Sequence, residues 1–128
     1  MIKLNHLALH AASKKNAVKF YNELLEFEIA YEFRVEKELA KKIFNLEVDL
    51  NVVMFKKNDI SIEVFISPEI SDRKNPINHF CIDLKERAKL INRLKENGIK
   101  ILEIDRGDHT TIFVKDYDSN IIEIKEQA

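Results

Sequence analysis

The sequence is poor in the residues that cross-link a chain or interrupt its regular structure. Cys81 is the one cysteine among 128 residues, so the chain cannot form an internal disulfide. Two glycines and two prolines leave little room for long flexible connections. These shortages exclude disulfide-rich and low-complexity proteins and favour a compact globular domain with short connections.

The sequence also lacks a surplus of one charge and a long apolar run. Lysine plus arginine number 21 against 22 aspartates plus glutamates, and no basic cluster is interleaved with aromatic residues, so nucleic acid is not an expected partner. No stretch approaches the ~20 apolar residues that a membrane span requires. The opening residues MIKLNHLALH do not form a secretory signal. We therefore expect a soluble, cytoplasmic protein with neither a nucleic-acid nor a membrane partner.

The sequence contains an internal repeat, because the same order of predicted strands and helices occurs twice. Apolar periodicity and turn signals predict a strand over 2–10, a helix over 14–26 and strands over 28–34, 49–56 and 59–66, with a short inserted helix within 35–46. After a linker at 67–76, which holds both prolines, they predict a strand over 77–84, a helix over 86–97 and strands near 99–104, 109–115 and 120–126. The prediction is a single α+β domain of two βαβββ repeats, 1–66 and 77–128.

The two repeats also match in their polar residues. Asn5-His6 opens the first half as Asn78-His79 opens the second, and Glu63 and Glu123 each lie between branched apolar residues in the last strand of a half. Because side chains alternate along a strand, both glutamates face away from the apolar side, and both histidines share that face. The sequence therefore predicts that His6, Glu63, His79 and Glu123 converge in one cavity.

These four side chains form a plausible ligand set for a divalent metal ion. Two imidazoles and two carboxylates suit Ni, Co, Mn, Fe or Zn, and no thiolate marks a structural zinc site. Four protein ligands on an octahedral ion leave two positions for water or substrate, which is a catalytic layout. The ordinary alternative is that strand glutamates face solvent and lone histidines pack in the core, but the matched repeat favours the metal.

Three further polar residues are weaker candidates. His10 shares the presumed cavity face, where it could contact a substrate or transfer a proton, although it could also be a partly exposed residue at the strand end. His109 follows Asp108 in a probable turn, where a solvated role is expected. Cys81 has the same parity as His79, yet a small buried thiol is the default for such a position.

Two segments carry a family resemblance that covers nearly the whole chain. HLALHAASKKNAVKFYNELLEFEI resembles the opening strand and helix of the vicinal oxygen chelate superfamily, and FVKDYDSNIIEI resembles its closing hairpin. That superfamily includes glyoxalase I, extradiol dioxygenases and the bleomycin and fosfomycin resistance proteins. The chain departs from the pattern at Glu26, where a glycine is usual, and at Tyr117 and Ser119, which replace the proline and glycine of the last turn.

The resemblance implies a curved mixed sheet around a metal-centred cavity, with helices on the outer face, and places the family's metal ligands at His6, Glu63, His79 and Glu123. This set is similar to that of metal-dependent glyoxalase I. It implies a lyase or isomerase that moves a proton in a small α-hydroxycarbonyl or hemithioacetal through a metal-stabilised enediolate, with Glu123 or Glu63 as the base. His10 stands where glyoxalase I carries an arginine that contacts glutathione. The resemblance therefore does not identify the thiol that the protein would use as co-substrate.

Other activities of the family remain as alternatives. An extradiol ring-cleaving dioxygenase needs only three ligands, so Glu63 as a fourth ligand speaks against it. A non-catalytic protein that binds a drug or small metabolite is the third possibility. The resemblance and the exposed sheet edges also predict a homodimer.

Overall fold

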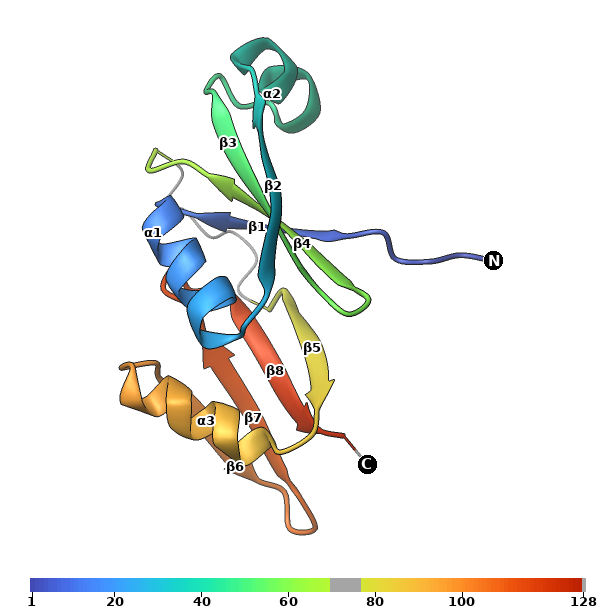
Figure 1. The fold of residues 1–128 in the computed structure, drawn as a ribbon, viewed down its shortest axis with the longest axis vertical. Helices are drawn as coiled ribbons and strands as arrows, with labels where there is room; N and C mark the ends of the chain where they lie inside the picture. The colour runs from blue at the N-terminus through green and yellow to red at the C-terminus, as the bar shows by residue number, and fades with distance from the viewer. Residues whose placement is uncertain (70–76, 128) are drawn as a thin grey trace. The chain divides into compact units, whose positions relative to one another are not determined.

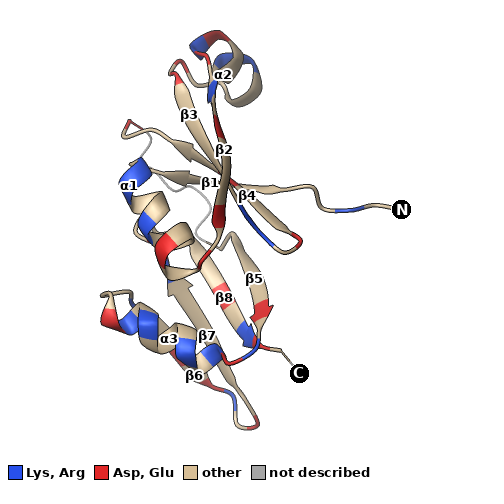
Figure 2. Ribbon diagram, in the orientation of Figure 1, with Lys and Arg blue, Asp and Glu red and all other residues tan. Residues whose placement is uncertain are grey.

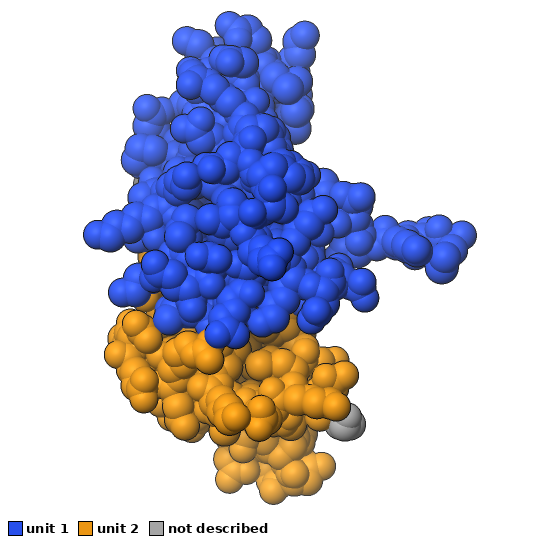
Figure 3. All heavy atoms as spheres, viewed as in Figure 1, with its two compact units in different colours: residues 1–71 blue, residues 72–128 orange. Residues whose placement is uncertain are grey.

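The structure is a computed structural model that describes residues 1–69 and 77–127 (Figure 1). The chain divides into two compact units, residues 1–71 and 72–128, which Figure 3 colours separately. The division falls inside the predicted linker 67–76, most of which lies outside the described residues. The two units therefore correspond to the two repeats predicted from the sequence.

Unit 1 is a four-stranded mixed sheet with its helices between the first three strands. Its elements are β1 (Leu7–Ala11), α1 (Lys14–Ala17), which continues as the π-helix η1 (Val18–Leu24), β2 (Glu28–Val35), α2 (Lys37–Phe44), β3 (Leu50–Lys57) and β4 (Ile60–Ile66). The strand order is β1-β4-β3-β2, with β1 parallel to β4 and the other neighbours antiparallel. The short inserted helix predicted within 35–46 is confirmed as α2.

Unit 2 repeats this topology with one helix. Its elements are β5 (His79–Leu84), α3 (Arg87–Glu96), β6 (Ile101–Asp105), β7 (Thr110–Lys115) and β8 (Ile121–Glu126). The strand order is β5-β8-β7-β6, again with the first strand parallel to the last. Two βαβββ units of α+β class are therefore confirmed. Among the described residues, no helix is long and apolar enough to cross a membrane.

The first helix begins where the sequence predicts and changes its winding after one turn. Ser13 is its N-cap and accepts a hydrogen bond from the Asn16 backbone N–H at 3.1 Å. The helix then widens, and the Leu25 N–H donates to the Phe20 carbonyl five residues back at 3.0 Å. Tyr21 is buried, with its ring centroid 5.6 Å from that of Phe55 on β3. This packing fixes the side of the sheet that faces the helix.

The last strand of each unit shows the predicted alternation. Ile62 and Val64 on β4, and Ile122 and Ile124 on β8, are fully buried at 0% exposure. Burying each of these side chains contributes roughly 1.5 to 3 kcal/mol, which strongly fixes which face points to the core. Each intervening glutamate is therefore directed to the other face of its sheet.

The first strand is shorter than predicted. The sequence predicts a strand over 2–10, whereas β1 begins at Leu7 and the residues before it are exposed. The prediction is wrong at this end because β1 has only β4 as a neighbour. Leu7 pairs with Ile62 and β4 begins at Ile60, so residues 2–4 extend past the end of β4 and have no strand to pair with.

Candidate metal site

In unit 1, strand register brings His6 and Glu63 together. Ala8 on β1 is the register partner of Glu63 on β4, and His6 lies two residues before Ala8. Residues two apart share a face, so the histidine and the glutamate are diagonal neighbours across parallel strands. The distance from His6 Nε2 to Glu63 Oε1 is 2.9 Å. This pair was predicted from parity alone, and the structure brings it into direct contact.

Unit 2 forms the same pair by the same register. Cys81 on β5 is the register partner of Glu123 on β8, and His79 lies two residues before Cys81. The distance from His79 Nε2 to Glu123 Oε1 is 3.8 Å. Each unit thus contributes one histidine and one glutamate in equivalent positions.

Both imidazoles are held in one tautomer by an oxygen on the far side of the ring. His6 Nδ1 lies 2.8 Å from the Asn5 side-chain oxygen, and His79 Nδ1 lies 2.8 Å from the Ile77 carbonyl oxygen. Because an amide or carbonyl oxygen only accepts hydrogen bonds, we assign the proton to Nδ1 in both rings. Nε2 of each ring faces the glutamate, as in metal-ligating histidines whose other nitrogen is fixed by an acceptor.

The donor set and its spacing fit a divalent cation. The side chains of His6 and His79 are 39% and 41% exposed, whereas those of Glu63 and Glu123 are 13% and 18% exposed. A largely buried carboxylate is stabilised by an adjacent cation, either a bound metal ion or a protonated imidazole ring. Metal bonds of about 2.1 Å at a right angle place two adjacent ligand atoms about 3.0 Å apart. The 2.9 Å pair in unit 1 meets this spacing, and the 3.8 Å pair is wider.

The candidate ligands occur as pairs, one in each unit. Across residues 1–69 and 77–127, no group of three or more His, Cys, Asp and Glu side chains that could hold a metal ion is formed. His6 and Glu63 belong to unit 1, and His79 and Glu123 to unit 2. A single centre with all four ligands therefore stays a prediction.

His10 is held by the backbone beyond β4. Its Nε2 donates to the Ser67 carbonyl oxygen at 2.9 Å, and the Ser67 N–H donates to the Ala11 carbonyl at 3.1 Å. His10 is half-buried on β1. These contacts give the ring a role in holding strand β1 to the following chain, and its predicted contact with a substrate stays a prediction.

Cys81 and His109 differ in how well their predictions hold. Cys81 is solvent-exposed, so the prediction of a buried thiol is wrong, because it lies on the face of β5 whose residues are exposed. Partial desolvation, followed by the charge of Glu123, still raises the pKa of this thiol. His109 lies in an exposed turn, with Nδ1 at 2.6 Å from Asp108 Oδ1, as the sequence predicted. Hydrogen bonding to His109 lowers the pKa of Asp108.

The hairpin between β7 and β8 fixes the position of Glu123. Asp116 is buried at 7% exposure, and its Oδ1 accepts the backbone N–H groups of Asp118 and Asn120, both at 2.9 Å. Ser119 in this turn adopts a φ of 68°, in the left-handed region where a glycine is usual. The turn thus forms with serine at the position where the sequence departs from the family pattern.

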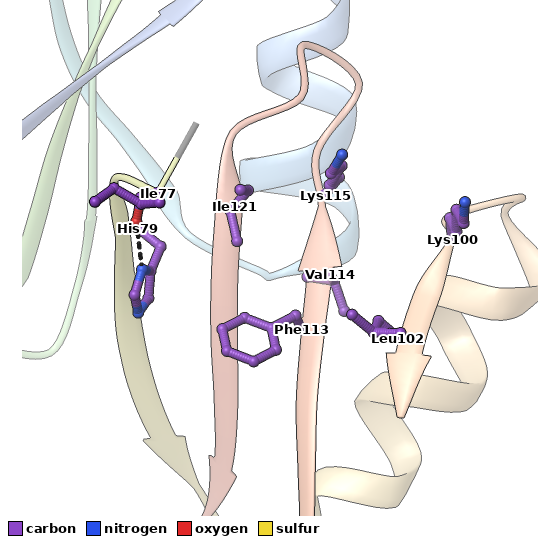
Figure 4. Close-up of a pocket in the computed structure, with 8 residues that line it drawn as sticks. All are labelled: Ile77, His79, Lys100, Leu102, Phe113, Val114, Lys115 and Ile121. Carbon is purple, nitrogen blue, oxygen red and sulfur yellow. Dashed lines mark hydrogen bonds between the residues drawn. The ribbon is translucent and has the colours of Figure 1, made fainter. Parts of the chain in front are cut away.

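A pocket of about 460 Å³ lies beside His79 in unit 2 (Figure 4). It is lined by Ile77, His79, Lys100, Leu102, Phe113, Val114, Lys115 and Ile121. The Phe113 ring lies edge-on to the His79 ring, with centroids 5.6 Å apart at an interplanar angle of 75°. Phe113 and both lysines were not predicted as site residues from the sequence, although the FVK segment of the closing hairpin contains two of them.

Comparison with known proteins agrees with this architecture. A family model described as the Glyoxalase/Bleomycin resistance protein/Dioxygenase superfamily matches residues 3–124. No curated protein matches the chain.

Solved structures of similar fold come from several bacteria. A glyoxalase family protein from Enterococcus faecalis is 22% identical with a TM-score of 0.71, covering 95% of each chain. A glyoxalase family protein from Bacillus cereus is 16% identical with a TM-score of 0.78, covering 98% of this chain and 94% of its own. Fosfomycin resistance protein FosX from Listeria monocytogenes, complexed with Mn(II) and 1S,2S-dihydroxypropylphosphonic acid, is 18% identical with a TM-score of 0.73, covering 98% and 90%. At these identities the likeness establishes the fold alone.

The family match spans nearly the whole chain and includes both His–Glu pairs. The chain belongs to the Glyoxalase/Bleomycin resistance protein/Dioxygenase superfamily.

Proposed function

We propose that the protein is a metal-dependent lyase or isomerase of the glyoxalase I type, acting on a small α-hydroxycarbonyl or hemithioacetal. The observation that carries the proposal is the matched pair in each unit, in which a histidine Nε2 faces a glutamate Oε1. His6, Glu63, His79 and Glu123 would together hold one divalent ion, either within one chain or across a homodimer. We place this activity in the cytoplasm.

In this proposal the two histidines bind the ion and their neighbours orient them. The Asn5 side chain and the Ile77 carbonyl hold the Nδ1 protons, so that both Nε2 atoms stay available as donors. The bound ion would act as a Lewis acid on two adjacent oxygens of the substrate. The half-exposed imidazoles leave the pairs open to solvent and hence to a small molecule.

The glutamates supply the proton transfer. One of Glu63 and Glu123 takes a proton from the carbon next to the carbonyl group, and the same carboxyl returns it to the adjacent carbon. No oxidant is consumed, because the carbon-bound proton moves to the adjacent carbon, the hydroxyl proton moves to the former carbonyl oxygen, and the electron pair shifts within the substrate. Both carboxylates are largely buried and face a histidine Nε2. His10 would contact the substrate from β1.

Relatives of similar fold support both the ion and the type of ligand. FosX has been crystallised with Mn(II), and one of its structures also holds 1S,2S-dihydroxypropylphosphonic acid. That molecule carries hydroxyl groups on two adjacent carbons, which is the vicinal arrangement of oxygens that an α-hydroxycarbonyl also offers. The proposal for this chain rests on the shared fold and on its own His–Glu pairs.

The first test is the metal content of the purified protein, measured by elemental analysis beside Glu63→Ala and His79→Ala. A single shared centre predicts close to one divalent ion per chain, lost in both variants, since each removes a ligand from the same ion. Independent centres in the two units would instead leave metal behind in each single variant. His109→Ala is the matched control, because His109 is exposed in a turn and belongs to neither pair.

Activity is then assayed on hemithioacetals of small α-oxoaldehydes with several thiols. Isomerisation that disappears on chelation and returns with one of Ni, Co, Mn, Fe or Zn supports the proposal. A metal-free wild-type protein that cannot be reloaded would remove the catalytic interpretation and leave small-molecule binding as the function.

A further inference from the structure

We propose that the pocket beside His79 binds a small organic anion, with its apolar body against Phe113 and Leu102 and its anionic group between Lys100 and Lys115. All of these residues line the same pocket in unit 2. The inference rests on the proposed function, because it names the substrate class of the site to which His79 belongs. It also has a binding test that does not need an active enzyme.

Strand register sets the positive residues and His79 in one row across the sheet. Lys115 on β7 is the register partner of Ile121 on β8, and Ile121 is the partner of His79 on β5. The antiparallel register of β6 and β7, continued by one residue, places Lys100 opposite Lys115. The row therefore runs from a candidate metal ligand at one edge strand to two lysines at the other side.

A second row, two residues further along the strands, supplies an apolar surface. Phe113 is the register partner of Glu123 on one side and of Leu102 on the other. Figure 4 shows the Phe113 ring between His79 and Leu102. A molecule that reaches from His79 toward the lysines would therefore lie over a phenyl ring and an aliphatic side chain, so its middle part should be apolar.

The two lysines carry charge that no carboxylate neutralises within the described part of the chain. Other lysines have acidic partners there, as in the ion pairs Lys14–Glu32, Lys57–Glu26, Lys89–Glu86 and Lys95–Glu103. Lys100 and Lys115 have no such pair, and none of the eight residues lining the pocket is acidic. Like charges opposite each other on neighbouring strands repel, so an anion between them is favoured.

The size of the pocket indicates an organic anion larger than an inorganic ion. Its volume of about 460 Å³ lies in the range of small-molecule sites. Two strand spacings separate β5 from β7, which puts the backbone of Lys115 roughly 10 Å from that of His79. A carboxylate or phosphonate on an aliphatic body of about six carbons spans this distance, whereas phosphate or sulfate does not.

The test is a titration of the isotope-labelled full-length protein, followed by NMR, with sodium hexanoate as the probe and hexanamide as its neutral counterpart. We expect saturable shifts of the Phe113, Lys115 and Ile121 signals with hexanoate, and at least fivefold weaker binding of hexanamide. Binding should weaken as sodium chloride is raised, because the lysines are exposed and screened. Hexylphosphonate, with an aliphatic chain of similar length, is the second anionic probe, and the tighter of the two anions identifies the anionic group.

Variants assign the effect to the two lysines. Lys100→Gln and Lys115→Gln should each weaken hexanoate binding at least fivefold, whereas Lys115→Arg keeps the charge and the binding. Lys89→Gln is the matched control, since Lys89 lies among the basic residues of α3 shown in Figure 2 and does not line the pocket. Equal binding of hexanoate and hexanamide, or unchanged binding in both glutamine variants, would overturn the inference.

The same samples separate this inference from the proposed function. Metal content should be unchanged in the lysine variants, because neither lysine is a ligand. A protein that holds metal but shows no saturable hexanoate binding refutes the anion pocket and leaves the proposed function standing. A protein that binds hexanoate through the lysines but cannot be loaded with metal confirms the pocket and refutes the metal-dependent activity.

Discussion

The carboxylate of Asp116 accepts hydrogen bonds from both the backbone and the side-chain amide of Asn120, at 2.9 and 2.8 Å. The Asp116 N–H in turn donates to the Asn120 carbonyl at 3.0 Å. This exchange closes the turn between β7 and β8. It thereby sets the start of β8, and two residues into that strand lies Glu123.

Asp116→Ala should destabilise the protein markedly. The substitution leaves buried amide donors without their acceptor, and the loss of hydrogen bonds to a charged group costs about 2 to 3 kcal/mol. We expect a lower urea midpoint with an unchanged slope. Asp83→Ala, on an exposed position of β5, serves as the control and should change the free energy of unfolding by less than about 0.5 kcal/mol. Equal stability of the two variants would contradict this role of Asp116.

Glu26→Gly should stabilise the protein. Glu26 has a φ of 63°, which is strained for any residue with a Cβ atom, and the sequence analysis found it at a position where the family usually has glycine. Glycine relieves the strain but has more conformational entropy in the unfolded chain. The net effect should raise the free energy of unfolding by about 0.5 to 1 kcal/mol. Glu23→Gly is the same change within η1, where glycine should cost about 1 kcal/mol. Thermal unfolding of both variants should show opposite shifts.

Asp49 makes the start of α2 sensitive to acid. The Glu36 side chain does not cap this helix, and Asp49 instead accepts the Lys37 backbone N–H at 2.8 Å and the Arg34 guanidinium at 2.7 Å. The Lys37 hydrogen bond, followed by the Arg34 charge, lowers the pKa of Asp49 below its ordinary 3.8. Because the pKa of Asp49 is lower in the folded state, ionised Asp49 stabilises the protein above pH 3.8. This stabilisation is lost as the pH falls through the lower folded-state pKa.

The test compares Asp49→Asn with wild type at two pH values. At pH ~6 the variant should be less stable, because asparagine has one accepting oxygen, which can keep the Lys37 hydrogen bond, and loses the carboxylate charge and the second acceptor that bind Arg34. As the pH falls through the lowered folded-state pKa of Asp49, the difference between the two proteins should shrink, since the carboxylate is then protonated. Asp59→Asn, in the exposed turn between β3 and β4, should have the same stability as wild type at both pH values. A difference that persists in acid would show that the carboxylate charge is not the cause.

The alternation of apolar and polar residues was enough to predict on which face of the sheet each glutamate lies. The pairing of strands could not be predicted from local sequence in the same way. In the segment ISIEVFI, the branched apolar residues on both sides of Glu63 point to the core, so Glu63 points to the opposite face of the sheet. The absence of a strand partner for residues 2–4 depends on where β4 begins, which no feature of those residues reveals. The pairing of Phe113 with Glu123 and Leu102 depends on the relative shift of three strands. The pocket therefore could not be predicted from any one segment, although the face on which each glutamate lies could.

Asn5→Ala should weaken metal binding without removing a ligand. The Asn5 side-chain oxygen lies 2.8 Å from His6 Nδ1 and fixes the tautomer in which Nε2 faces Glu63. Without this acceptor the ring can rotate or carry its proton on Nε2, and the loss of such a partner typically costs 10- to 100-fold in metal affinity. Asn5→Asp keeps an oxygen at the position and should retain the affinity. Calorimetric titration with the preferred metal measures the affinity, and nitrogen chemical shifts of His6 report the tautomer. A tautomer that shifts while the affinity stays constant would remove His6 from the ligand set.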